Sequence, residues 1–190
     1  MTMYIRQNPL DTLEKNVRFL MDRTAILDCI HRHARGCDRH DVDLINAAYH
    51  SDGVDEHGHA VNSGPDYGEW ANKTHAETSR VHTHNITTHS CEIDADTAHA
   101  ESYVIVVLIG SDTKSAQFIT GRYIDRLERR DGQWRIVVRR STVEGMFLAD
   151  ARVLQAPSFT EKGYLVGTRD RHDLSYERPL SSDTPAPARW

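Results

Sequence analysis

The chain has 190 residues, of which 38% are hydrophobic and 27% charged, a balance that favours one domain with a compact core. Its formal net charge of −5 argues against binding nucleic acid through a basic surface. The longest apolar run, at residues 103–110, is much shorter than the roughly 20 residues that span a bilayer. We therefore expect neither nucleic acid nor a membrane as partner.

The cysteines and the first residues indicate a cytoplasmic protein. Cys29, Cys37 and Cys91 are odd in number and form no CxxC motif, which excludes a disulfide scaffold and fits a reducing compartment. Residues 1–16 lack the basic, apolar and small-residue pattern of a secretory signal.

The first half of the chain has helical periodicity. The stretch DTLE at residues 11–14 resembles a capping box and begins a first helix. Asp22 is placed to cap a second helix over residues 23–38. Further helices are predicted over residues 42–50 and 67–79, the last opened by a Gly-Pro-Asp turn.

After residue 80 the apolar period changes to two, which predicts four long strands with turns between them, at residues 81–94, 97–110, 115–129 and 133–144. Helices followed by antiparallel strands define an α+β class. We expect a curved, mostly antiparallel sheet wrapped over the N-terminal helices and enclosing an apolar pocket. Residues 1–147 form this predicted domain, and residues 148–190 are an extension whose last ten residues are expected to be disordered.

Two residues are the main candidates for chemistry. Asp38 ends the second predicted helix at the edge of its apolar stripe, and His84 shares a predicted strand face with Ile86. A carboxylate facing a cavity needs a partner to stay charged, and a buried imidazole needs a hydrogen-bond partner. Pairing Asp38 with His84 would meet both needs and raise the basicity of the ring. The alternative is a solvated helix-end aspartate and an exposed histidine.

Other candidates are less specific. His33 lies on the apolar stripe of its helix, where a histidine is more often a satisfied core residue than a catalytic one. His57 lies on or near a short predicted strand, where it could line the mouth of a cavity. Arg139 and Arg140 must point to opposite sheet faces, and the inward one could bind an oxyanion or a leaving group.

A metal site was weighed because His82, His84 and His89 have ligand-like spacing. His82 and His84 share one predicted face, whereas His89 is on the other, and we expect His82 and His89 to be ordinary polar residues on an exposed strand. The prediction is therefore no metal. Nucleotide-binding, hydrolase and zinc-protease motifs are absent from the sequence, so no cofactor is expected.

Three stretches together resemble the SnoaL-like branch of the nuclear transport factor 2-like superfamily: DRTAILDCIHRHARGCDRHDVDLINAAYHSDGVDEHG, RVHTHNITTHSCEIDADTAHAESYV and GRYIDRLERRDGQWRI. The resemblance covers about residues 10–147. It implies a cone-shaped α+β barrel with a deep apolar pocket, and a homodimer or homotrimer. The family includes scytalone and bile-acid dehydratases, a dehydrochlorinase, polyketide cyclases and a formaldehyde-releasing lyase.

The resemblance also implies site residues. Asp38 and His84 match the Asp–His pair that several of these enzymes use, and Arg139, five residues after Trp134, matches the arginine of the dehydrochlorinase. His33 stands at a tyrosine position of the dehydratases. Substrate contacts are expected from His57, Tyr49, Trp70, Thr88 and Tyr123, where His57 falls near a pocket tyrosine and Thr88 at a family asparagine.

The sequence thus predicts a cofactor-independent lyase in which His84 is the general base and Asp38 orients it, with help from His33 or Arg139. Water, halide or formaldehyde would leave a small apolar aromatic or polycyclic substrate. Three alternatives stay open: a non-catalytic binding or assembly member of the same fold, an isomerase or cyclase for a steroid- or polyketide-like substrate, and metal-assisted chemistry.

Overall fold

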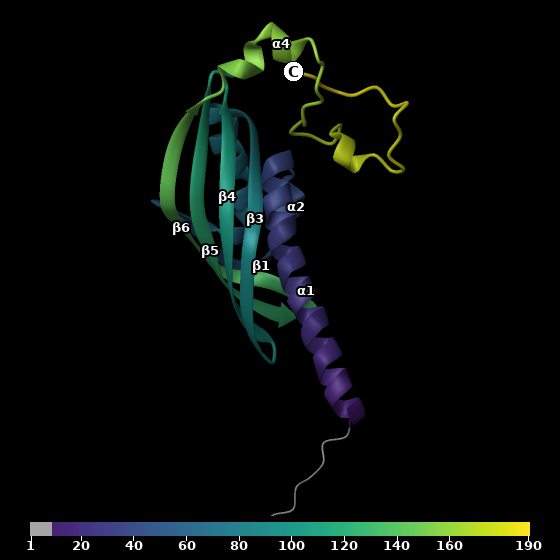
Figure 1. Cartoon of the computed structure of the whole chain (residues 1–190). Coiled ribbons are helices and arrows are strands. Elements are labelled where there is room, and N and C mark those ends of the chain that lie inside the picture. The colour runs from purple at the N-terminus through teal and green to yellow at the C-terminus, as the bar shows by residue number, and fades with distance from the viewer. Residues whose placement is uncertain (1–8) are drawn as a thin grey trace, which may run out of the picture.

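The computed structural model describes residues 9–190 and shows one long helix packed against a curved six-stranded sheet (Figure 1). The helices and strands run in the order α1 Pro9–Arg39, α2 Val42–Asn46, β1 Tyr49–His57, β2 Ala60–Ser63, α3 Tyr67–Thr78, β3 Ser79–Asp94, β4 Thr97–Gly110, β5 Ser115–Arg130, β6 Gln133–Asp150 and α4 Pro157–Thr160. Short 3-10 turns precede α3 and follow β6. This is the α+β class that the sequence predicts.

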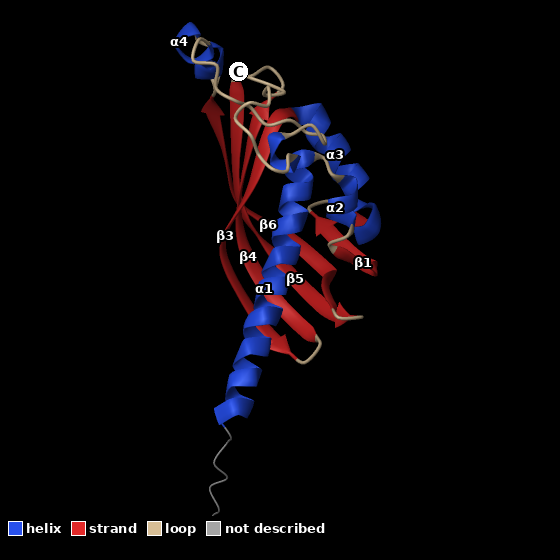
Figure 2. Ribbon diagram, turned by 90° about the vertical axis from the view of Figure 1, so that its right-hand side faces the viewer, coloured by secondary structure: helices blue, strands red, loops and turns tan. Residues whose placement is uncertain are grey.

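The strand order in the sheet is β2-β1-β6-β5-β4-β3. All neighbours pair antiparallel except β1 and β6, which are parallel. The sheet is therefore mixed and curved but does not close, because β2 and β3 stay as its two edges. The expected barrel is an open cone, and α1 crosses its face with α2 and α3 beside its C-terminal end (Figure 2).

The predicted break between two N-terminal helices is wrong, because α1 is continuous through Asp22. Asp22 instead accepts hydrogen bonds from the indole of Trp134 at 2.9 Å and from Arg129 at 2.8 Å, which anchor the middle of the helix to the sheet. No glycine or proline lies between Pro9 and Gly36 to interrupt the helix. The first turns project beyond the sheet (Figure 1). No helix among residues 9–190 is long and apolar enough to cross a membrane.

The core lies between the second half of α1 and the inner face of the sheet. Ile26, Cys29 and Ile30 of α1 are fully buried against Leu127 and Ile136 of the sheet. Burying such side chains contributes about 1.5–3 kcal/mol each. This packing fixes the last turn of α1 above the sheet, where Asp38 lies.

Two predicted boundaries move. The helix expected over residues 42–50 ends at Asn46, and Tyr49 already begins β1, where its buried ring takes a strand position. The last strand continues to Asp150, past the expected end at residue 144. Its extra residues pair with the first residues of β5, from Ser115 to Thr120.

The C-terminal residues return to the end of α1. Asp173 pairs with Arg39 at 2.6 Å, and the hydroxyl of Tyr176 donates to Asp41 at 2.7 Å. In the last ten residues, for which composition predicts disorder, Arg189 pairs with Leu165 and the backbone N–H of Trp190 donates to the carbonyl of Tyr164 at 3.0 Å.

Gly121 is a test of the curvature. A Cβ there would lie 2.0 Å from the backbone oxygen of Thr142, at the register shift between β5 and β6. We expect Gly121→Ala to lower the free energy of unfolding by at least about 2 kcal/mol, because the backbone itself must move. Urea denaturation measures this. Gly58→Asn is the control, since Gly58 has φ +65 and nothing nearby; equal losses in both variants would contradict the explanation.

Candidate active site

Asp38 and His84 meet. Nδ1 of His84 lies 2.7 Å from Oδ1 of Asp38, and the backbone N–H of His84 donates to both carboxylate oxygens at 3.0 Å. The side chain of Asp38 is 14% exposed and that of His84 is 6% exposed. The last turn of α1 supplies the carboxylate and the first half of β3 supplies the ring, so core packing holds both.

The carboxylate fixes the tautomer of His84. An ionised aspartate only accepts hydrogen bonds, so Nδ1 of the ring must carry the proton. The neutral ring then has its lone pair on Nε2, which makes no hydrogen bond within residues 9–190. His84 is thus arranged to take up a proton at Nε2, and Asp38 stabilises the imidazolium that results.

His84 lines a cavity of about 370 Å³, within the size range of small-molecule sites. Strands β4, β5 and β6 supply its apolar wall: Val104, Val106, Leu108, Ile119 and Val143. The polar lining comprises His57, His75, His84, Tyr123, Ser141 and Thr142. The expected apolar pocket is therefore present, with a few polar groups facing it.

The Asp38–His84 pair also borders a second hollow of about 380 Å³. Its lining is largely charged or polar and includes Arg35, Arg39 and Asp173. Those groups are already paired with one another or with the C-terminal residues. The apolar cavity is the better place for an organic substrate, because burying an apolar molecule there displaces water from apolar surface.

Two histidines lie behind His84: His82, and His75, which sequence reasoning missed. The ring of His75 in α3 is 4.1 Å from that of His82 and 5.4 Å from that of His84, centroid to centroid. Burial lowers the pKa of His75 to about 2 and the pKa of His82 to about 4. The spacing from Tyr67 to Ala71 to His75, four residues at each step, was the available signal for an inward His75.

His82 is buried, so the expectation that it lies on an exposed strand face is wrong. Its Nε2 lies 2.8 Å from the carbonyl oxygen of Cys37. His89, expected on the opposite face, is returned toward the inside by an irregularity between Ile86 and His89, and its Nδ1 contacts the buried Ser102 hydroxyl at 2.9 Å. His89 lies outside the groups of described residues that could together hold a metal ion.

His33 and Arg139 form a buried network rather than part of the cavity wall. Arg139 makes a bidentate ion pair with Asp125, at 2.7 and 2.8 Å, and donates to Nδ1 of His33 at 3.0 Å. Burial opposes the charge of Arg139, but Asp125 together with the hydroxyls of Tyr49 and Tyr123 raises the pKa of Arg139 well above its usual value. Arg140, by contrast, is exposed on the outer face of the sheet. This confirms the expectation that the two arginines point to opposite faces.

The network continues to β1. Nε2 of His33 contacts the hydroxyl of Tyr49 at 3.1 Å, and this hydroxyl donates to Asp55 at 2.5 Å. Burial and the charge of Arg139 lower the pKa of His33 well below its usual value. His33 is therefore neutral at pH 7, which argues against its use as a general acid.

The predicted substrate contacts separate into two groups. His57 and Tyr123 line the cavity, and Nδ1 of His57 lies 3.1 Å from the Ser141 hydroxyl. The other three do not: Tyr49 is fully buried in the network, Trp70 packs beside His57 at 6.0 Å between ring centroids, and Thr88 is exposed. Thr88 follows Ile86, where the strand register shifts and the inward face changes.

The open α+β cone of this chain fits the fold of the nuclear transport factor 2-like superfamily. A family model for the SnoaL-like domain matches residues 18–140, and the chain belongs to this family. No curated protein sequence matches the chain.

Solved structures agree on the fold. A hexachlorocyclohexane dehydrochlorinase, LinA-type3 from Novosphingobium barchaimii, is 19% identical with a TM-score of 0.65, over 70% of this chain and 94% of that one. A candidate scytalone dehydratase from Novosphingobium aromaticivorans is 15% identical with a TM-score of 0.61, over 67% and 87%. Rv3472 from Mycobacterium tuberculosis, of unknown function, is 28% identical with a TM-score of 0.59, over 66% and 77%.

The buried ion pair predicts a contrast between neighbouring arginines. Arg139→Ala leaves Asp125 buried without its partner and should lower the free energy of unfolding by about 3–5 kcal/mol. Arg140→Ala removes only an exposed pair with Glu56 and should leave stability nearly unchanged. Urea denaturation compares the two variants. A small loss in Arg139→Ala would show that the pair is not buried.

His33 predicts a pH effect on stability. Unfolded, it binds a proton near its ordinary pKa of 6.5, whereas in the folded chain burial and Arg139 lower that pKa far below this value. The unfolded state therefore binds more protons below pH 6.5, and stability falls as the solution is acidified. In His33→Gln the fall between pH 6.5 and 5 should be shallower by up to about 1.4 kcal/mol per pH unit. Identical slopes in urea denaturation would contradict this.

Proposed function

We propose that the protein is a cofactor-independent lyase in which Nε2 of His84 removes a proton from the substrate. The observation that carries this proposal is the 2.7 Å contact between Nδ1 of His84 and Asp38, with the ring at the wall of an apolar cavity. Asp38 holds the ring in the tautomer that accepts a proton at Nε2. A positioned base contributes about 10²–10⁴ in rate.

The reaction we propose is an elimination. In the loss of halide or water, His84 takes a proton from carbon, the C–H electron pair forms the new C=C bond, and the bonding pair leaves with halide, or with hydroxide that takes the proton from the imidazolium to become water. In the loss of formaldehyde, His84 takes the proton of a hydroxymethyl O–H group, the O–H pair becomes the second bond of the formaldehyde carbonyl, and the C–C bonding pair stays on the substrate, which takes the proton back from the imidazolium. His57 and Ser141, which contact each other at 3.1 Å at the cavity wall, are the groups we assign to the departing end. Tyr123 borders the same space.

The substrate class follows from the lining. Valine, leucine and isoleucine side chains form the apolar part of the wall, and a cavity of about 370 Å³ suits a compact aromatic or polycyclic skeleton. The names of two structural neighbours, a dehydrochlorinase and a candidate scytalone dehydratase, are consistent with such substrates. We expect the protein to act in the cytoplasm, since its three cysteines are free. We also expect a homodimer or homotrimer, as the family resemblance implies.

The test uses a panel of aromatic and polycyclic compounds with a hydroxyl, halide or hydroxymethyl group beside an acidic C–H bond. Product formation is followed by chromatography, and released halide or formaldehyde is assayed separately. For any compound that turns over, His84→Ala should lower kcat/KM by about 10²–10⁴. Asp38→Asn should also lower it strongly, because an amide does not stabilise the imidazolium.

The matched control is His99→Ala, which removes an exposed histidine of β4 away from the cavity. Its kcat/KM should equal that of the unsubstituted chain. Full activity in both His84→Ala and Asp38→Asn would refute the assignment of base and orienting group. Binding of panel compounds without any turnover would favour the non-catalytic alternative.

A further inference from the structure

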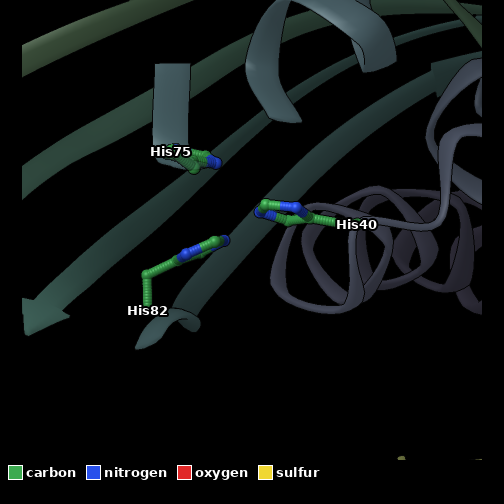
Figure 3. A group of neighbouring side chains, drawn as sticks. All are labelled: His40, His75 and His82. Carbon is green, nitrogen blue, oxygen red and sulfur yellow. The ribbon is translucent and has the colours of Figure 1, made fainter. Parts of the chain in front are cut away.

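Three histidines from separate elements converge behind the Asp38–His84 pair. His40 follows the last turn of α1, His75 lies near the end of α3, and His82 lies in β3. Each offers a ring nitrogen, and the three nitrogens lie within 4.8 Å of one another. Figure 3 shows the rings pointing into a common space from three directions.

Two of these nitrogens have no partner. Nε2 of His40 and Nδ1 of His75 are buried and make no hydrogen bond within residues 9–190. A buried polar atom without a partner costs about as much as a lost hydrogen bond, and each such atom in a native structure calls for a bound water, an ion or a functional reason. Here both unpartnered atoms belong to the same cluster.

The third ring, that of His82, has one nitrogen held by the backbone. Its Nε2 lies 2.8 Å from the carbonyl of Cys37, so Nε2 carries the proton and Nδ1 keeps the lone pair. Nδ1 lies 3.4 Å from the Ser79 hydroxyl, which also donates to the carbonyl of His75 at 2.9 Å. A ligand histidine usually donates its other ring N–H to a carbonyl or carboxylate in this way.

The backbone at His40 adds an independent observation. Asp41 N–H donates to the carbonyl of Gly36 at 2.9 Å and His40 N–H donates to that of Cys37 at 3.3 Å, which is the helix-ending motif that favours glycine at the residue after the cap. His40 occupies that position with φ 51. A side chain kept where its backbone is unfavourable suggests that the side chain itself has a use.

We propose that His40, His75 and His82 form a binding site for a divalent transition metal of the zinc class. Imidazole suits Zn²⁺, Ni²⁺, Cu²⁺ and Fe²⁺, whereas Mg²⁺ and Ca²⁺ require oxygen ligands. Tetrahedral zinc places ligand nitrogens about 3.4 Å apart, so the rings need only small rotations inward. Three protein ligands leave a fourth position for water.

One negatively charged group and one positively charged group lie next to the cluster. Oδ1 of Asp38 lies 3.9 Å from Nε2 of His82 and supplies a negative charge. Arg169, which donates to the carbonyl of His75 at 3.2 Å, is the opposing cation.

A metal here would join the end of α1 to α3 and β3. These elements carry Asp38 and His84, but the proposed ligands do not include either residue. The site therefore goes beyond the proposed base, and its role is to hold the wall of the cavity, which His75 lines.

The experiment titrates the full chain, freed of metal with a chelator and dialysed, with Zn²⁺ or Co²⁺. We expect one metal per chain by isothermal titration calorimetry. With Co²⁺ we expect the visible absorption bands that are typical of four-coordinate Co²⁺ with nitrogen ligands. Thermal unfolding should shift upward by at least about 4 °C with metal at a hundredfold excess over Kd. Mg²⁺ should neither bind nor shift the unfolding temperature.

Two variants remove one ligand each. His75→Ala and His40→Gly should weaken Zn²⁺ binding by more than about 100-fold, beyond the usual loss on removing an outer-shell partner. Glycine suits the φ of residue 40, so His40→Gly should fold at least as well as the unsubstituted chain without metal. His99→Ala, which removes an exposed histidine, should bind as before.

His84→Ala separates this site from the proposed base. It should keep the metal while losing turnover. Loss of metal in His84→Ala with retention in His40→Gly would instead place the ion on Asp38, His82 and His84, the other group with suitable spacing, and would overturn the proposal. No uptake by the unsubstituted chain would overturn it too, and would leave water as the partner of the unpaired nitrogens. The outcomes that decide the metal site are all measurements of metal binding and do not depend on turnover.

Discussion

The hydrogen bonds between Asp38 and His84 are the constraint on which the site depends. β3 is an edge strand, so one side of its backbone has no strand to pair with. Asp38 accepts the backbone N–H of His84 on that side as well as the ring Nδ1–H. One carboxylate therefore caps the sheet edge, joins it to the last turn of α1 and sets the tautomer of the ring. Edge strands are exposed to unwanted pairing unless such groups are covered.

How much of this could be predicted from sequence depends on the scale of the signal. Alternating residues and turn residues predict most ends of the four long strands to within two residues, because period two and turn chemistry are local, but the last strand runs past its expected end at residue 144 to Asp150. The meeting of Asp38 and His84 is long-range, and only burial arguments and family resemblance indicated it. The irregularity after Ile86 could not be predicted, and it moved Thr88 outward and His89 inward, because one added residue exchanges the faces.

The placement of His33 and Arg139 shows a different limit. Both were correctly expected to face inward, but a pattern cannot tell a cavity wall from a packed interior. Arg139 points its charge at Asp125, and His33 passes hydrogen bonds from Arg139 to Tyr49. Such a chain is satisfied at nearly every atom, and a satisfied buried network is rigid. Its contribution to the site is to position β1, β5 and β6, which carry His57, Tyr123 and Ser141.

The end of α1 concentrates negative potential on one small region. The last carbonyls of a helix carry about half a negative charge in sum, and the carbonyl of Cys37 accepts from His82 while the carboxylate of Asp38 accepts from His84. A cation within this region is therefore stabilised. The imidazolium that we propose for His84 is one such cation, and the metal that we propose on the neighbouring rings is another. The two proposals share one electrostatic cause but have separate ligands, which is why substitutions can tell them apart.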